Sequence, residues 1–162
     1  MNNGSRSSTQ NARTWHKDSL EMKESQNYTI YADGGARGNP GPAAYGFVIY
    51  DEQGSKIYEE GRAIGKTTNN VAEYSGVVAA LKWIISSIQY PVSSIQFFLD
   101  SQLVAEQLSG GWKIKSENLR NLFFTIKDLE QKIGAKVTYS NVPREQNREA
   151  DRLVNATLDN KS

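Results

Sequence analysis

The order of strand-like and helix-like segments constrains the fold of this chain more than any other feature. Residues 28–33 alternate between apolar and polar side chains, as a half-buried strand does. Two more strand-like segments follow across Gly-containing turns before the first helical pattern begins. The predicted strands are 28–33, 43–51, 56–64, 94–100 and 135–142, and the predicted helices are 71–88, 101–111, 116–134 and 146–158. The order is therefore β-β-β-α-β-α-α-β-α.

Few topologies accommodate this order. Three consecutive strands joined by short turns form an antiparallel meander. The helix at 71–88 is then a crossover, and right-handed crossovers place strand 94–100 parallel to strand 28–33. The last strand follows by a second crossover. We therefore predict an α/β fold with a five-stranded mixed sheet of order 3-2-1-4-5 and helices on both faces.

The first 27 residues differ in composition from the rest. They are rich in Ser, Asn and charged residues and contain no apolar stretch of the kind found in secretory signals. We expect a disordered tail at 1–27 and a single domain at 28–162. The only histidine, His16, falls in the tail, so we do not expect it to act as a metal ligand or a base.

Composition excludes several classes of site. The absence of cysteine excludes disulfides and thiolate metal sites, and a single histidine excludes a multi-histidine zinc site. No apolar run is long enough to span a membrane, and we expect a cytoplasmic protein. Residues 28–162 carry 15 basic and 15 acidic residues, so net charge alone does not indicate nucleic-acid binding.

Four acidic residues are candidates for one metal site. Asp33 and Asp100 end the first and fourth predicted strands, which the topology makes parallel neighbours, and ligand sites in open sheets lie at such strand ends. Glu73, in the first turn of the helix at 71–88, and Asp151, on the last helix, can reach the same edge. Carboxylates this close repel one another, so a divalent cation is their natural partner. Oxygen ligands favour Mg²⁺ or Mn²⁺, and two such ions promote phosphodiester cleavage.

Each acid also has a purely structural interpretation. Asp33 precedes two glycines and suits a turn, whereas Glu73 suits the acidic position of a capping box. Asp100 suits a helix N-cap, and Asp151 suits an ion pair with Arg148 or Arg152. Two strand-end acids beside a helix-start acid nevertheless favour the metal site when the four are taken together.

Four segments, taken in order, resemble the ribonuclease H family of type HI: DGGARGNPGPAAYGFV, TTNNVAEY, FLDSQLV and VPREQNREADRL. The resemblance implies a metal-dependent endonuclease that cuts the RNA strand of an RNA·DNA hybrid, leaving 5′-phosphate and 3′-hydroxyl ends. It implies that Asp33 bridges two ions and that Glu73 and Asp100 hold the ion on the leaving-group side. It also implies that Asp151 holds the ion that binds the nucleophilic water.

Polar residues beside the acids suit a hybrid substrate. An enzyme that distinguishes RNA from DNA needs donors and acceptors for ribose 2′-hydroxyls, and Asn69, Asn70 and Gln102 are amides that flank three of the acids. Asn39 lies in the Gly-rich loop. The resemblance implies that these four residues contact the hybrid and that Thr68 helps to bind a phosphate of the DNA strand.

The segment after the second predicted helix differs from many members of the family. Trp112 stands beside Lys113 and Lys115, a mixture that can hold a nucleic-acid backbone, although a core tryptophan is an equal alternative. The basic protrusion of some members is missing here. The loop VPREQN also lacks the histidine that many members have there, and Arg144 or Glu145 are the candidates to replace it.

Other functions stay open from the sequence. The segment DGGARGNPG suits a small phosphate- or nucleotide-binding module. A catalytically inactive hybrid-binding protein would carry the same fold. A nuclease acting on double-stranded RNA or on RNA–DNA junctions would share the acids and the fold with a hybrid-specific enzyme.

Overall fold

The computed structural model describes residues 26–160. The strands are β1 (Gln26–Ala36), β2 (Gly41–Tyr50), β3 (Lys56–Thr67), β4 (Val92–Leu99) and β5 (Lys136–Asn141). The helices are α2 (Asn69–Ser87), α3 (Gln102–Leu108), α4 (Glu117–Ile133) and α5 (Arg148–Asp159), with a short 3₁₀ turn, η1 (Arg144–Gln146), before α5. All nine predicted elements are present, and among residues 26–160 only η1 was not predicted.

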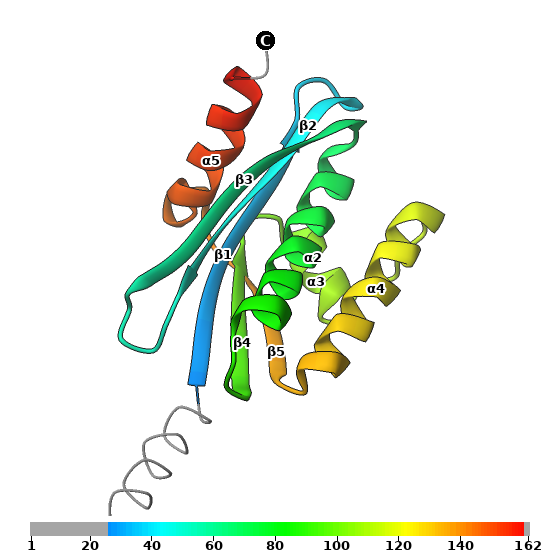
Figure 1. Cartoon of the computed structure of the whole chain (residues 1–162). Coiled ribbons are helices and arrows are strands. Elements are labelled where there is room, and N and C mark those ends of the chain that lie inside the picture. Colours follow the sequence, from blue (N-terminus) through cyan, green and yellow to red (C-terminus); the bar gives the residue numbers. More distant parts are fainter. Residues whose placement is uncertain (1–25, 161–162) are drawn as a thin grey trace, which may run out of the picture.

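The five strands form one sheet in the order β3-β2-β1-β4-β5, which confirms the predicted topology. β1 pairs antiparallel with β2 and parallel with β4, and β5 pairs parallel with β4. Figure 1 shows α2, α3 and α4 on one side of the sheet and α5 on the other. The sheet therefore presents the ends of β1 and β4 side by side at one edge.

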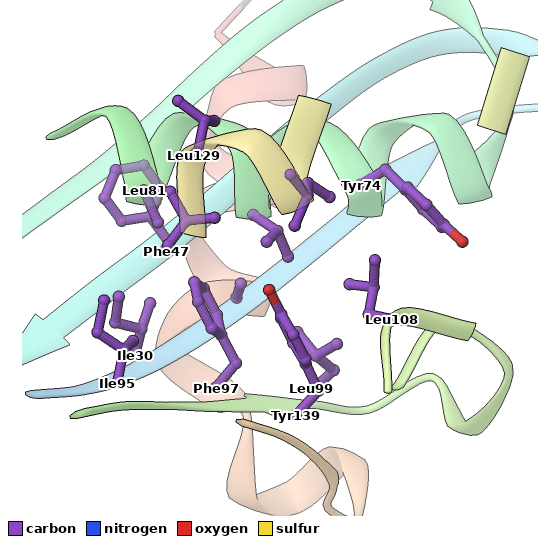
Figure 2. Packing of buried hydrophobic residues seen from close by; sticks show 14 of the residues in the cluster. Ile30, Phe47, Tyr74, Leu81, Ile95, Phe97, Leu99, Leu108, Leu129 and Tyr139 are labelled. Atoms are coloured by element: carbon purple, nitrogen blue, oxygen red, sulfur yellow. The ribbon is translucent and has the colours of Figure 1, made fainter. Parts of the chain in front are cut away.

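The main core lies between the sheet and α2, α3 and α4. Alternate residues of β1, such as Ile30 and Ala32, are almost fully buried on this face. Figure 2 shows apolar side chains of the sheet, among them Phe47 and Phe97, gathered with Leu81 of α2. β2 is buried along nearly its whole length because α5 packs against it from the other side. This central packing fixes the strand ends that carry the predicted acids.

β1 is longer than predicted at both ends. It begins at Gln26, two residues before the expected domain boundary, and the main-chain N–H and the side chain of Asn27 both donate to Oε1 of Glu52, at 2.9 and 2.8 Å. It continues past Asp33 to Ala36, paired there with β2. The rest of the predicted tail, including His16, lies outside the described residues. Within residues 26–160 no helix has the length and apolar character needed to cross a bilayer.

Candidate active site

Three of the predicted acids lie together at the edge where β1 and β4 stop pairing. The last parallel pair of these strands is Tyr31 with Phe98, so Asp33 and Asp100 each follow two residues beyond it. Carboxylate oxygens of Asp33, Glu73 and Asp100 lie within 4.8 Å of one another. Three acids from two strand ends and one helix therefore share one small volume.

Glu73 reaches the site because α2 lies very close to β1. The N-cap of α2 is Thr68, whose hydroxyl oxygen accepts a hydrogen bond from the N–H of Val71 at 3.2 Å. Glu73 is therefore in the second turn of the helix rather than the first, and the capping-box interpretation is wrong. A Cβ atom on Gly34 would lie 2.4 Å from the main-chain nitrogen of Glu73, so only glycine permits this approach.

Asp100 is not a helix cap. Ser101 caps α3 instead, its hydroxyl oxygen accepting from the N–H of Val104 at 3.2 Å. The alternative interpretation of Asp100 is therefore wrong, and its carboxylate faces Asp33 and Glu73.

Asp151 lies in the first turn of α5, close enough to Asp33 for its carboxyl group to raise the pKa of Asp33. Its ion-pair partner is Arg144, with 3.8 Å between Nη2 and Oδ1. Arg152, one of the two partners considered from the sequence, pairs with Glu59 instead. The fourth acid thus borders the three-carboxylate cluster without belonging to it.

Burial and mutual repulsion make the protonated forms of these acids favourable. Asp33 and Glu73 are 6% and 7% exposed. Burial, with the charges of Asp100 and Asp151, raises the pKa of Asp33 to about 8. Burial, with the charges of Asp33 and Asp100, raises the pKa of Glu73 to about 9. Burial also raises the pKa of Asp100, against the lowering effect of the Arg144 guanidinium.

Such a cluster fits a divalent cation. A cation with a preference for carboxylate oxygens compensates the repulsion that otherwise favours protonation. The donors are all hard oxygen ligands, and none of the described residues is a cysteine or a histidine. The chemistry of the donor set therefore suits Mg²⁺ or Mn²⁺ better than zinc.

The predicted amides lie around the start of α2. The side-chain oxygen of Asn39 accepts from the main-chain N–H of Asn69 at 3.0 Å, and that of Asn69 accepts from the N–H of Ala36 at 2.8 Å. The Gly-rich loop is thereby tied to α2. Asn39, Thr68 and Asn70 line one pocket of about 290 Å³, together with residues at the start of α4.

Two further predicted residues lie at the surface near α3. Gln102, the first residue of α3, is exposed. Trp112 follows α3 and is 45% exposed, so the interpretation as a core tryptophan is wrong. An indole with that exposure is available for stacking.

Comparison with known proteins identifies the family. The sequence profile described as "Reverse transcriptase-like" matches residues 31–157. The crystal structure of LC11-RNase H1 in complex with an RNA/DNA hybrid is 38% identical and superposes with a TM-score of 0.77, covering 82% of this chain and 96% of that one. The chain belongs to the ribonuclease H family.

Other relatives support this family membership. Ribonuclease HI of Halobacterium salinarum is 38% identical over 129 residues, which are 80% of this chain and 63% of that protein. The bifunctional protein Rv2228c of Mycobacterium tuberculosis is 42% identical over 131 residues. The match covers 80% of this chain and 35% of the bifunctional protein, so the chain spans about a third of that relative.

Three polar residues of the candidate site were not predicted from the sequence. Ser116 and Asn118, at the start of α4, line the pocket that contains Asn39 and Thr68. The Ser-Glu-Asn pattern that begins a helix signals only a cap, and Ser116 does cap α4. Asn147 is buried before α5, and its side-chain amide donates to the carbonyl oxygen of Ala32 at 2.9 Å. No local pattern reveals a bond between residues so far apart in the chain.

Proposed function

We propose that this ribonuclease H hydrolyses the RNA strand of RNA·DNA hybrids with the help of Mg²⁺ or Mn²⁺. The observation that carries the proposal is the set of three carboxylates within 4.8 Å of one another at the edge of the sheet. A relative of the same fold, LC11-RNase H1, has been crystallised with an RNA/DNA hybrid.

The four acids have distinct places in the proposal. Asp33 is central, because it shares the cluster with Asp100 and Glu73 and also interacts with Asp151. We assign Glu73 and Asp100 to the leaving-group side and Asp151 to the side of the attacking water. Two divalent cations held by these residues would supply an activated water and stabilise charge on the leaving oxygen. The products would carry 5′-phosphate and 3′-hydroxyl ends.

The amides supply recognition of the hybrid in this proposal. Asn39, Thr68 and Asn70 share a pocket with no charged side chain, so it would hold a sugar or phosphate through neutral hydrogen bonds. Asn69 and Gln102 flank the acids and offer donors and acceptors to 2′-hydroxyls. Trp112 is exposed enough to stack on a sugar or base. A domain with equal numbers of acidic and basic residues can therefore bind a polyanion.

Cleavage of a hybrid with end-labelled RNA tests the proposal. The wild type should cut it with Mg²⁺ or Mn²⁺ and stop when EDTA is added. Asp33→Asn and Asp100→Asn should each lower turnover by roughly a hundredfold or more, because each removes a charge on which the reacting centre depends. Asp128→Asn, which alters an exposed acid of α4, is the matched control and should cut normally.

The same assay separates the alternatives. Cleavage that continues in EDTA, or at the wild-type rate in Asp33→Asn, would contradict the proposed site. Parallel reactions with double-stranded RNA and with an RNA–DNA junction decide whether the hybrid is the preferred substrate. Hybrid binding without cleavage would indicate an inactive binding protein.

A further inference from the structure

Asn147 connects the two elements that carry Asp33 and Asp151. Its side chain is buried, with 1% exposure, and Nδ2 donates to the carbonyl oxygen of Ala32 at 2.9 Å, directly before Asp33. Its own main-chain carbonyl accepts from the N–H of Asp151 at 3.1 Å. One residue therefore joins the end of β1 to the first turn of α5.

The side chain of Asn147 is not used as an asparagine before a helix commonly is. Asn147 stands at the N-cap of α5, yet its side chain makes no capping hydrogen bond. Instead, Nδ2 reaches across to β1. The side-chain amide therefore connects α5 to β1 and does not cap its own helix.

The other end of the same amide lacks a partner. Oδ1 of Asn147 is the only buried side-chain polar atom among residues 26–160 without a hydrogen bond. A buried oxygen in this state destabilises the fold, and an apolar side chain of similar size would avoid that cost. Such an apolar side chain would lose only the hydrogen bond that Nδ2 donates. We infer that this donated bond is the reason for an asparagine at position 147.

The bond from Asn147 adds to the packing of α5 on the sheet. α5 packs against β1, β2 and β3, and its first turn lies close to β2, because a Cβ on Gly46 would be 2.7 Å from the carbonyl oxygen of Ala150. At the site end, Asp151 is close enough to Asp33 to raise its pKa, so the two carboxylates repel each other when both are ionised. The bond from Asn147 to Ala32 opposes that repulsion at the point where it acts.

We propose that Asn147 is a positioning residue that holds Asp151 against Asp33 and thereby sets the affinity of the site for divalent cations. The role of Asn147 in turnover rests on the proposed function, whereas its effect on cation binding does not depend on that function. Asn147 would touch neither cation nor hybrid and would act through Asp151.

Calorimetric titration of the full chain with Mn²⁺, without hybrid, tests the proposal. Asn147→Ala and Asn147→Leu should each weaken Mn²⁺ binding by about tenfold or more, the size of effect seen when residues behind metal ligands are changed. With hybrid, kcat at a fixed low Mn²⁺ concentration should fall while KM for the hybrid stays unchanged. Raising the Mn²⁺ concentration should restore part of kcat.

Gln107→Met is the matched control. Gln107 is a similarly buried amide, 5% exposed, that accepts a hydrogen bond from the Tyr74 hydroxyl at 2.7 Å between α2 and α3. This variant should unfold at a lower temperature and keep its Mn²⁺ affinity. In Asn147→Leu the new side chain fills the space of the asparagine. Its Mn²⁺ affinity therefore tests the proposal if Asn147→Ala does not fold.

The outcomes are distinct. Wild-type Mn²⁺ affinity in a folded Asn147→Leu protein would overturn the proposal, as would an equal loss of affinity in Gln107→Met. A wild type that binds Mn²⁺ and leaves the hybrid uncut would defeat the proposed function, while the affinities would still decide the role of Asn147.

Discussion

Arg144 is the cationic side chain that most directly affects the acid cluster. Its guanidinium lies 3.8 Å from Asp151 and lowers the pKa of Asp100, against the effect of burial. It stands in the loop where many members of the family have a histidine. An arginine there cannot exchange a proton near neutral pH, but it supplies a fixed positive charge.

Removing that charge should shift the pH dependence of turnover. Arg144→Ala should raise the pKa of Asp100, so that the carboxylate needed for cation binding forms only at higher pH. The acidic limb of the pH–kcat profile should therefore move to higher pH. Arg144→Lys, which keeps a positive charge, should move it less. An acidic limb at the wild-type pH in Arg144→Ala would contradict this role.

That Asp33, Glu73 and Asp100 lie together could be predicted from the sequence, but their exact surroundings could not. From the sequence, Glu73 and Asp100 could each be a helix-capping residue or a metal ligand. The structure excludes the capping interpretation because the hydroxyl groups of Thr68 and Ser101 cap α2 and α3. Which of several adjacent polar residues becomes the cap depends on where the helix starts, and that is set by packing against the sheet.

Of the two adjacent glycines after Asp33, one is required for the approach of α2 to β1. A Cβ on Gly34 would be 2.4 Å from the carbonyl carbon of Ala72, whereas a Cβ on Gly35 has no neighbour nearer than 3.9 Å. The two glycines are adjacent in the sequence and look equivalent there. Only Gly34 brings Glu73 beside Asp33.

Gly34→Ala should therefore separate the acids, and Gly35→Ala should not. We expect Gly34→Ala to lower the free energy of unfolding by about 1–3 kcal/mol, as overpacking does, and to weaken Mn²⁺ binding. Chemical denaturation and calorimetry measure the two effects. Equal behaviour of the two variants would show that α2 can shift without consequence for the site.

The order of the helices and strands could be predicted from the sequence. Where each of them ends, and which distant residues touch, could not. Short turns and two crossovers determined the sheet, because few topologies satisfy both. β1 nevertheless runs to Ala36, since pairing with β2 continues after pairing with β4 has stopped. The contact of Asn147 with Ala32 joins residues 115 positions apart, which no local pattern encodes.

The whole domain should be less stable without cations as pH rises. The pKa values of Asp33 and Glu73, about 8 and about 9, lie above those of an unfolded chain, about 4. Between these values the folded protein holds protons that the unfolded chain has released, so stability falls as pH rises through this window. Mg²⁺ should therefore raise the melting temperature more at pH 9 than at pH 5.

Variants of the acids check the sign of this effect. Glu73→Gln removes one titrating group, so the melting temperature of the metal-free variant should fall less steeply between pH 5 and pH 9 than that of the wild type. Thermal unfolding followed by circular dichroism in EDTA gives both slopes. A wild-type slope in the variant would show that Glu73 does not titrate in this window.

The domain at 26–160 should act without the residues that precede it. All proposed site residues lie between Asp33 and Asp151, and β1 begins at Gln26. A protein lacking residues 1–25 should fold and cleave the hybrid at nearly the wild-type rate. The cut belongs before Gln26, because Asn27 bonds to Glu52 and Ser94. A large fall in turnover would assign the N-terminal residues a part in catalysis.

Anomalous diffraction from a crystal of the protein soaked in Mn²⁺ would show whether the clustered carboxylates bind a divalent cation. We expect manganese to be ligated by carboxylate oxygens of Asp33, Glu73 and Asp100, with Asp151 at the border of the site. Manganese bound elsewhere, with none in contact with Asp33, would contradict it.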